Sequence, residues 1–288
     1  MILLIMSILI IIIFLMIKFK GNNFVESFEI NHLDRYLDNI HPQQYNVKVK
    51  NKNGVHSKAE FVKIYKKCIK PIPNKYYDML NSYTQKIDSI FKKKNLDNLI
   101  KPWEFKISEN LEGKMPYTFS NCIVIDKNHI NDEFDEYKLS GINKFFLELL
   151  IHEKTHIIQR NNQLRFDEYY FINYPFVYSK FPCENLPDKL KKIYMTNPDS
   201  NFHMWKYKYR NIIFYPLLVG TDKRFKECGF KCDTLEELNM SIIKKHYDIN
   251  HKASFYHPNE VFACQFSENI LNNNIDYSII QLVNSLEF

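Results

Sequence analysis

The sequence has few cysteines, and they are not spaced as in a structural zinc site. Its 288 residues include six, at positions 68, 122, 183, 228, 232 and 264. Only Cys228 and Cys232 are close together, and no second pair is present that could complete a four-cysteine zinc site. We therefore expect reduced thiols, with a bridge between Cys228 and Cys232 as the alternative.

Dense clusters of positive charge are also lacking. The formal net charge is +6, but the basic residues are spread along the chain and the most notable run is Lys92-Lys93-Lys94. A nucleic-acid surface needs a denser basic stripe with aromatic residues beside it. The composition therefore argues against nucleic acid as a partner, and we interpret the lysine run as a solvated helix end.

Charged side chains are absent from residues 1–17, where Ser7 is the only polar residue. No basic segment precedes this apolar run and no small-residue cleavage site follows it, so we expect an uncleaved transmembrane anchor rather than a signal peptide. Lys18 and Lys20 follow the run and favour the cytoplasmic side. The rest of the chain is then expected at the membrane, facing the cytosol or an equivalent compartment such as a virion interior.

The most informative segment is His152-Glu153-Lys154-Thr155-His156. Residues four apart lie on one face of a helix, so both imidazoles can bind the same Zn²⁺ while Glu153 reaches a water on the metal. Ser140-Gly141 and Arg160-Asn161-Asn162 are typical of helix ends. We predict a buried helix over about residues 141–160, with an apolar stripe made by Ile142, Phe145, Phe146, Leu149 and Ile157. The alternative is that the two histidines are ordinary core residues.

A catalytic zinc site usually has three protein ligands and an open fourth position. The metzincin pattern would place a glycine three residues and a histidine six residues after His156, but the chain has Gln159 and Asn162 there. A second helix that begins near Pro258 would place Glu260 beside small residues, where another helix can approach closely. We predict Glu260 as the third ligand; the alternatives are His257, His251 and Glu268.

Together, His152-Glu153-x-x-His156 and Asn259-Glu260-x-x-Ala263 resemble the gluzincin group of zinc metallopeptidases, in which a glutamate on a later helix completes the site. The similarity covers roughly residues 100 to 275, and the first motif is also similar to uncharacterised zincin-like proteins of large DNA viruses. Cys264 and Gln265 replace the acidic residues that some gluzincins carry after the ligand, which leaves the hydrogen-bond partner of the histidines unassigned.

The resemblance implies an α+β fold with a zincin-like catalytic domain over residues 76–288, in which the active-site helix packs on a small sheet. A small N-terminal region at residues 18–75 and the anchor would precede it. An edge strand just before the active-site helix could bind substrate backbone as an added strand.

Local patterns predict the remaining elements. Residues 74–94 have helical apolar spacing, and the aromatic-dense stretch 169–178 is more typical of core than of a cleft lining. The segments with strand patterns are 103–107, 117–125, a small hairpin that starts with 45–49, and a second hairpin formed by 205–209 and 212–215.

These features predict a zinc metallopeptidase that hydrolyses peptide bonds in a peptide or protein substrate. Zn²⁺ on His152, His156 and Glu260 would activate a water, and Glu153 would act as the general base. The candidates for stabilising the oxyanion are His203, His251, Tyr256 and His257.

Two other functions are compatible with the sequence. A catalytically silent zincin-fold structural or binding protein, such as a virion component, is the first, although a structural zinc site has no use for Glu153 as a base. A membrane-tethered interaction module with a chance motif is the second, and it would bind no metal.

Overall fold

The computed structural model describes residues 32–51, 54–200, 203–220, 225–249 and 254–286. Its contacts divide the chain into two compact units, Met1–Asn39 and Ile40–Phe288. In the first unit, residues 32–38 are helical. The second unit contains the predicted site and combines helices with two sheets, so the α+β class is as expected. The predicted division near residue 75 stays a prediction.

The predicted transmembrane anchor, residues 1–17, lies outside the described residues. Within the ranges that the structure does describe, no helix combines the length and apolar character needed to cross a membrane. A spanning helix needs about 20 mostly apolar residues, whereas the longest described helix, Lys144–Asn161, carries several charged side chains. The predicted fold class is therefore corrected to α+β without a supported transmembrane helix, and the predicted membrane localisation is likewise unsupported.

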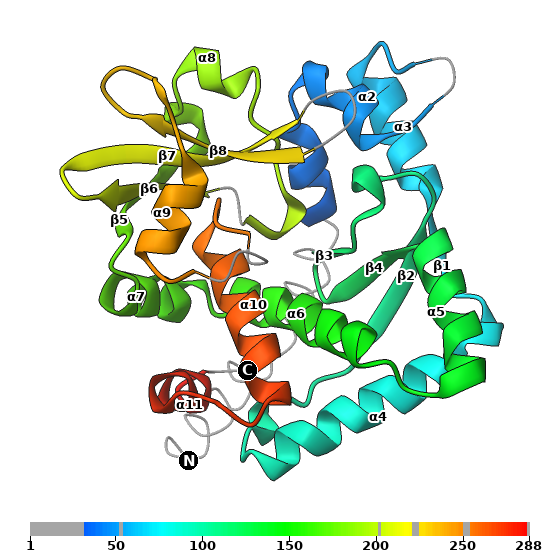
Figure 1. Cartoon of the computed structure of the whole chain (residues 1–288). Helices are drawn as coiled ribbons and strands as arrows, with labels where there is room; N and C mark the ends of the chain where they lie inside the picture. The colour runs from blue at the N-terminus through cyan, green and yellow to red at the C-terminus, as the bar shows by residue number, and fades with distance from the viewer. Residues whose placement is uncertain (1–31, 52–53, 201–202, 221–224, 250–253, 287–288) are drawn as a thin grey trace, which may run out of the picture. The chain divides into compact units, whose positions relative to one another are not determined.

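The first sheet has four strands in the order β1-β2-β4-β3 (Figure 1). They are β1 (Ile69–Pro71), β2 (Glu104–Ser108), β3 (Tyr117–Phe119) and β4 (Cys122–Asp126). Strands β2 and β4 are parallel, and the two outer pairs are antiparallel. The predicted run 117–125 is thus two strands, because Ser120 turns the chain with a positive φ of 49°. The resulting hairpin makes β3 an edge strand.

The second sheet is an antiparallel meander of five strands in sequence order. They are β5 (Val177–Pro182), β6 (His203–Tyr209), β7 (Ile212–Gly220), β8 (Phe225–Lys231) and β9 (Glu237–Leu238). The β6–β7 pair confirms the predicted hairpin. Cys228 and Cys232 are both thiols, so the alternative bridge between them is not formed.

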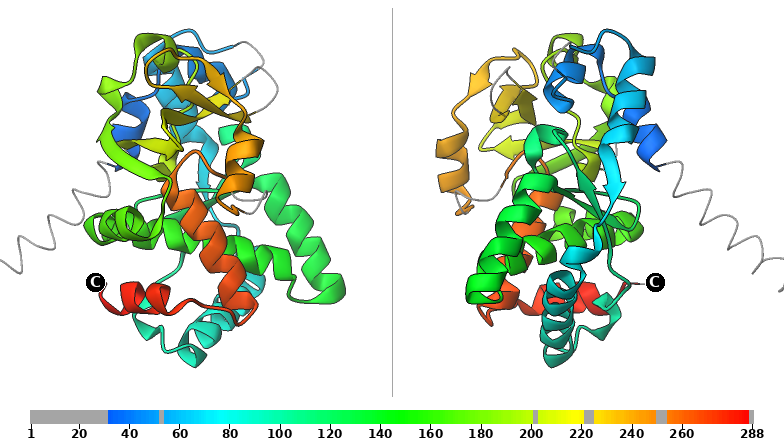
Figure 2. Two further views of the ribbon diagram at one scale, coloured as in Figure 1. Left: turned by 60° about the vertical axis from the view of Figure 1, so that its left-hand side comes forward. Right: turned by 90° about the vertical axis from the view of Figure 1, so that its right-hand side faces the viewer.

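The helices around the sheets are visible in Figures 1 and 2. They are α2 (Tyr45–Lys48), α3 (Lys58–Cys68), α4 (Tyr77–Lys93), α5 (Lys127–Ser140), α6 (Lys144–Asn161), α7 (Gln163–Asn173), α8 (Asp188–Lys191), α9 (Met240–His246), α10 (Pro258–Leu271) and α11 (Tyr277–Asn284). Short 3₁₀ turns are η1 (Pro42–Gln44), η2 (Asn74–Tyr76), η3 (Asp97–Leu99), η4 (Glu112–Lys114), η5 (Cys183–Asn185) and η6 (Pro198–Ser200). The predicted helices near 74–94 and after Pro258 are confirmed.

The helix with the histidine motif begins later than predicted. Gly141 has a φ of 78° and ends α5 instead of starting α6, as glycine commonly does after a helix. Asn143 caps α6, because its side chain accepts a hydrogen bond of 2.8 Å from the Phe145 backbone N–H. Ile142 therefore precedes the helix and is 41% exposed, and Phe145 is 76% exposed, so neither joins the predicted buried stripe.

The predicted strand at residues 45–49 is wrong, because residues 45–48 form helix α2. The Tyr45 ring stacks on Phe61 with centroids 4.4 Å apart, and Lys48 Nζ contacts Glu112 Oε2 at 2.6 Å. Residues three apart share a face on a helix but point to opposite faces of a strand. Burying both side chains against these partners therefore favours the helix.

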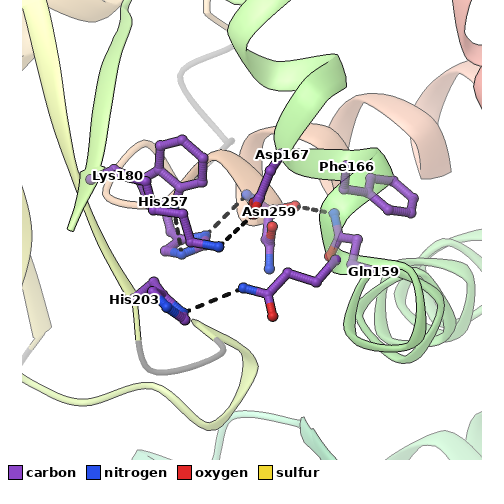
Figure 3. Close-up of a pocket in the computed structure, with 9 residues that line it drawn as sticks. Gln159, Phe166, Asp167, Lys180, His203, His257 and Asn259 are labelled. Atoms are coloured by element: carbon purple, nitrogen blue, oxygen red, sulfur yellow. Dashed lines mark hydrogen bonds and ion pairs between the residues drawn. The ribbon is translucent and has the colours of Figure 1, made fainter. Parts of the chain in front are cut away.

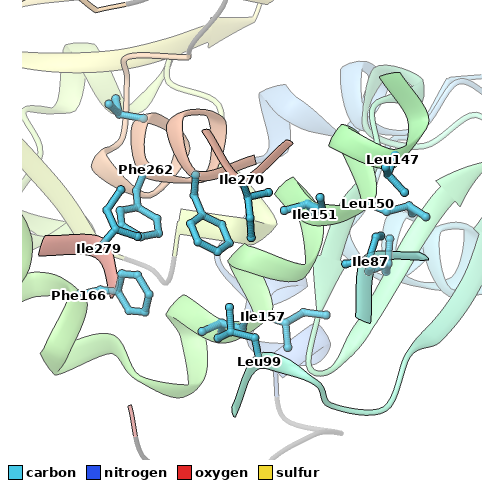
Figure 4. Close-up of a cluster of buried hydrophobic side chains, with 14 of the residues drawn as sticks. Ile87, Leu99, Leu147, Leu150, Ile151, Ile157, Phe166, Phe262, Ile270 and Ile279 are labelled. Atoms are coloured by element: carbon cyan, nitrogen blue, oxygen red, sulfur yellow. The ribbon is translucent and has the colours of Figure 1, made fainter. Parts of the chain in front are cut away.

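Helix α6 lies at the centre of the main core (Figure 4). It packs against α10, α4, α7 and the strands β3 and β4. Its buried side chains include Phe146, Leu147, Leu150, Ile151 and Ile157. The core also contains Tyr170, Tyr174 and Phe176, so the interpretation of the aromatic-dense stretch as core is confirmed for these residues, whereas Phe171 and Tyr178 are each 49% exposed. Because α6 is held on several sides, the side chains of the motif project from a rigid element.

Candidate metal centre

The packing of α6 against α10 brings the three predicted ligands together. The two Nε2 atoms of His152 and His156 are 3.0 Å apart. Glu260 places Oε2 at 3.4 Å from His152 Nε2 and Oε1 at 3.6 Å from His156 Nε2. Within the described ranges, this is the one group of at least three His, Cys, Asp or Glu side chains that is compact enough to hold a metal ion.

The spacing of these atoms fits a zinc ion. Tetrahedral Zn²⁺ with ligands at about 2.0–2.1 Å places neighbouring ligand atoms about 3.3 Å apart. The two histidine nitrogens are 3.0 Å apart, and each has a different oxygen of Glu260 nearby, at 3.4 Å from His152 and 3.6 Å from His156. Two imidazole nitrogens and one carboxylate are also a donor set that suits zinc. Three protein ligands leave a fourth position for water or substrate.

Of the alternative third ligands, His257 and Glu268 do not join this group. His257 caps α10, where its Nδ1 accepts from the Asn259 backbone N–H at 3.1 Å, and its Nε2 lies 3.1 Å from Trp205 Nε1. Burial lowers the pKa of His257 to about 3, so it stays neutral in this structural role. Glu268 lies two turns beyond Glu260 on α10, and His251 lies outside the described residues.

Two polar side chains hold Glu260 in place. Tyr256 donates its hydroxyl to Glu260 Oε1 at 2.9 Å, and Asn197 donates its amide to the same oxygen at 3.0 Å. Burial alone would raise the pKa of Glu260, but His156 and His152 outweigh this and hold it well below its usual value. The Tyr256 hydroxyl keeps its proton, because burial and the charge of Glu260 raise its pKa well above the ordinary range.

Gln159 is the hydrogen-bond partner of His156 that the sequence left unassigned. Its side-chain oxygen lies 2.8 Å from His156 Nδ1, the nitrogen that faces away from the ligand group. Burial would lower the pKa of His156, but the charges of Glu260, Asp199 and Glu153 raise it to about 10. The spacing from His156 to Gln159 is one helical turn, and this was the only signal in the sequence that pointed to the contact.

Glu153 is buried, with 4% of its surface exposed, and its Oε2 has no hydrogen-bond partner among the described residues. Burial, the charge of Asp199 and the charge of Glu260 raise its pKa well above the usual value for a glutamate. A buried polar atom without a partner is costly. Glu153 thus lies next to the ligands with a capacity to accept and hold a proton, and no structural role uses that oxygen.

Asp199 joins three elements around the site, and nothing in the sequence singled it out. Its carboxylate accepts from the Thr118 backbone N–H on β3 at 3.1 Å and from Arg160 on α6 at 3.4 Å. Its backbone carbonyl accepts from the Asn259 amide on α10 at 3.2 Å. Arg160 also donates to the Thr118 hydroxyl at 2.6 Å and the Thr118 carbonyl at 3.3 Å.

This network changes the expected role of the edge strand. Both backbone groups of Thr118, the central residue of β3, already bond to Asp199 and Arg160. The middle of this edge therefore has no free donor for pairing with a substrate strand. Any substrate contact with β3 has to lie on either side of Thr118.

A cavity of about 680 Å³ opens onto the metal centre and is lined by His152, Glu153, His156 and Glu260. This volume lies in the range that is usual for ligand sites. Apolar side chains form much of the remaining wall: Met115, Pro116, Phe145, Leu149, Met195, Leu218 and Phe225. Tyr256 lines the same cavity, so of the three oxyanion candidates in the described residues, His203, Tyr256 and His257, it is the one that the structure places there.

A second cavity, of about 10 Å³, lies behind Gln159 and Asn259 (Figure 3). Space of that size accommodates about one water molecule, so it cannot hold a peptide. His203 and His257 line this small cavity rather than the large one. They are therefore not placed to act on a substrate in the large cavity.

No protein-family model, no curated protein and no solved structure matches the chain. The resemblance to gluzincins remains a prediction that rests on the two motifs.

Proposed function

We propose that the protein is a zinc-dependent metallopeptidase whose active site is the large cavity. The observation that carries this proposal is the buried, unpartnered carboxylate oxygen of Glu153, one residue from His152 and beside the ligand group. A site that served only to hold zinc for stability would be closed by four protein ligands and would gain nothing from this costly carboxylate.

His152, His156 and Glu260 would hold the ion. When bound, Zn²⁺ supplies Lewis acidity, which lowers the pKa of water and polarises a carbonyl. Glu153 accepts the proton of the attacking water as general base and delivers it to the leaving amine as general acid. The charge of a bound Zn²⁺ would favour the ionised form of Glu153, which is the form that accepts a proton.

Tyr256 is the side chain that we assign to the oxyanion. Its hydroxyl lies against the ligand Glu260, remains protonated and lines the cavity. In the metal-free protein the one hydrogen of this phenol goes to Glu260 Oε1, so it would have to turn to the attacked carbonyl oxygen to stabilise the negative charge that develops there. Tyr256→Phe is expected to lower kcat by a factor on the order of 10² to 10³, with little change in zinc content.

The test combines zinc analysis with cleavage of a broad peptide library by the full chain. Wild type should contain one zinc per chain and cleave peptides, Glu153→Gln should keep the zinc and lose cleavage, and His156→Ala should lose both. His246→Ala on α9 and Glu168→Gln on α7 remove the same residue types away from the cavity, and both should behave as wild type.

Two results would count against the proposal. Zinc in wild type without cleavage of any library peptide would favour a catalytically silent protein with a zinc site. Absence of zinc under metal-replete conditions would exclude the metal centre altogether.

A further inference from the structure

We propose that Gln159 is a positioning residue that determines which nitrogen of His156 faces the metal centre and couples His156 to the start of α10. The inference rests on the metal site of the proposed function but not on catalysis. Figure 3 shows Gln159 reaching from α6 toward Asn259, the residue before Glu260.

The orientation of the Gln159 amide follows from its partners. Its Nε2 lies 3.0 Å from the Asn259 backbone carbonyl, which can only accept a hydrogen bond. Nε2 also donates to the Tyr170 hydroxyl at 2.9 Å, and that hydroxyl donates in turn to Asn259 Oδ1 at 3.0 Å. Both amide hydrogens are then used, and the amide oxygen must face His156.

This orientation determines the tautomer of His156. An amide oxygen only accepts, so His156 Nδ1, 2.8 Å away, must carry a hydrogen and donate it. When His156 is neutral, as a metal ligand must be, its other nitrogen is free of hydrogen. The lone pair of Nε2 then points toward His152 and Glu260, where a metal would lie.

Burial makes the arrangement stiff. Gln159 and Tyr170 are at most 1% exposed, His156 is 2% exposed and Asn259 is 5% exposed. Turning the amide would leave several buried polar groups without hydrogen-bond partners, which is unfavourable in a buried site. Through this network the position of His156 on α6 depends on the backbone of α10 that carries Glu260.

The two histidines therefore differ. The side chain of His152 is 22% exposed, and among the described residues its Nδ1 has no hydrogen-bond partner comparable to Gln159. We infer that His156 and Glu260 form a preorganised half of the site, whereas His152 is the ligand with most freedom to move.

The experiment compares the Zn²⁺ affinity of wild type, Gln159→Met and Gln163→Met by competition with a chelator. Methionine keeps the length of glutamine but makes no hydrogen bonds of this kind. Gln163 is the matched control, because it lines the same small cavity and contacts His203 instead of His156. Affinity should fall about 10–100-fold for Gln159→Met and stay close to wild type for Gln163→Met.

A second measurement separates positioning from general stability. In the Zn²⁺-loaded wild type, ¹H–¹⁵N spectra of the imidazoles should show a slowly exchanging hydrogen on His156 Nδ1, and this exchange should speed up in Gln159→Met. If Gln159→Met does not fold, Tyr170→Phe removes one partner of the amide while leaving Gln159 and His156 intact, and it should show a smaller change in the same direction.

Wild-type affinity and a protected Nδ1 hydrogen in Gln159→Met would overturn the inference while leaving the metallopeptidase proposal intact. The predicted loss of affinity in a protein that cleaves no peptide would support the inference and refute the metallopeptidase proposal. Absence of Zn²⁺ binding in wild type would overturn both.

Discussion

Replacing Arg160 with methionine tests whether α6 is anchored to the edge strand β3 by charge. Arg160 and Asp199 are nearly buried, with side chains 10% and 5% exposed, and their closest atoms are 3.4 Å apart. Arg160 also donates to the Ser120 carbonyl at 2.6 Å. Methionine removes these bonds and leaves the Asp199 carboxylate buried with Thr118 as its remaining partner.

The magnitude follows from the burial of the pair. Removing one partner of a buried ion pair costs about 3–5 kcal/mol, because the remaining charge loses its paired opposite charge. For a protein of this size 1 kcal/mol corresponds to about 2–4 °C in Tm, so Tm should fall by about 6–20 °C. Arg165→Met on α7 is the control, since Arg165 and its partner Glu168 are 52% and 65% exposed and such pairs contribute at most about 1 kcal/mol.

The assay monitors unfolding by urea and by heat with circular dichroism. A chelator is present so that metal binding does not add to the stability of either variant. Arg160→Met should be less stable than Arg165→Met by at least about 2 kcal/mol, the difference between the two ranges. Equal stability of the two variants would refute the argument that Arg160 and Asp199 couple α6 to β3.

Two further predictions concern pH and the core. The pKa of His156 in the metal-free protein is raised to about 10 from an ordinary value of 6.5, so its contribution to stability is complete below pH 6.5 and is lost as pH rises toward 10. Zn²⁺ has to displace that proton, so the apparent affinity for Zn²⁺ should rise between pH 6 and 9. If a chelator competition shows no change in affinity over this range, the ion pair between His156 and Glu260 is contradicted. Leu150 on α6 is fully buried and Leu164 on α7 is 78% exposed. In urea unfolding, Leu150→Ala should lower the free energy of unfolding by about 2–5 kcal/mol, whereas Leu164→Ala should change it by no more than about 0.5 kcal/mol. Similar losses for both would argue against α6 as the centre of the core.

The ligand group is the part of the site that the sequence predicted best, because helix geometry is local. Residues four apart share a helix face wherever the helix lies, so the pairing of His152 with His156 required no knowledge of the fold. Glu260 could be predicted for a similar reason, since Pro258 indicated a helix start and small residues indicated close helix packing. The sequence could not show that α10 reaches α6, and the distances between Glu260 and the histidines were decided by tertiary packing.

The errors arose where a long-range contact or the neighbouring element outweighed a local pattern. Residues 45–48 are helical because Tyr45 and Lys48 need to face Phe61 and Glu112 together. Gly141 ends one helix instead of starting the next, and sequence spacing cannot distinguish the two roles. The membrane anchor was inferred from hydropathy at residues 1–17, which lie outside the described part of the chain, and no described helix supports it.

By itself, the sequence determined the chemistry that is present: two imidazoles and a carboxylate at helical spacing, with a second carboxylate on a later helix. The tertiary structure alone decided how that chemistry is held. Asp199, Asn197 and Tyr256 come from segments without a recognisable motif, and Gln159 gains its role only because the Asn259 carbonyl and the Tyr170 hydroxyl meet its amide. Hydrogen bonds depend on positions within a few tenths of an ångström, and only the folded chain sets those positions.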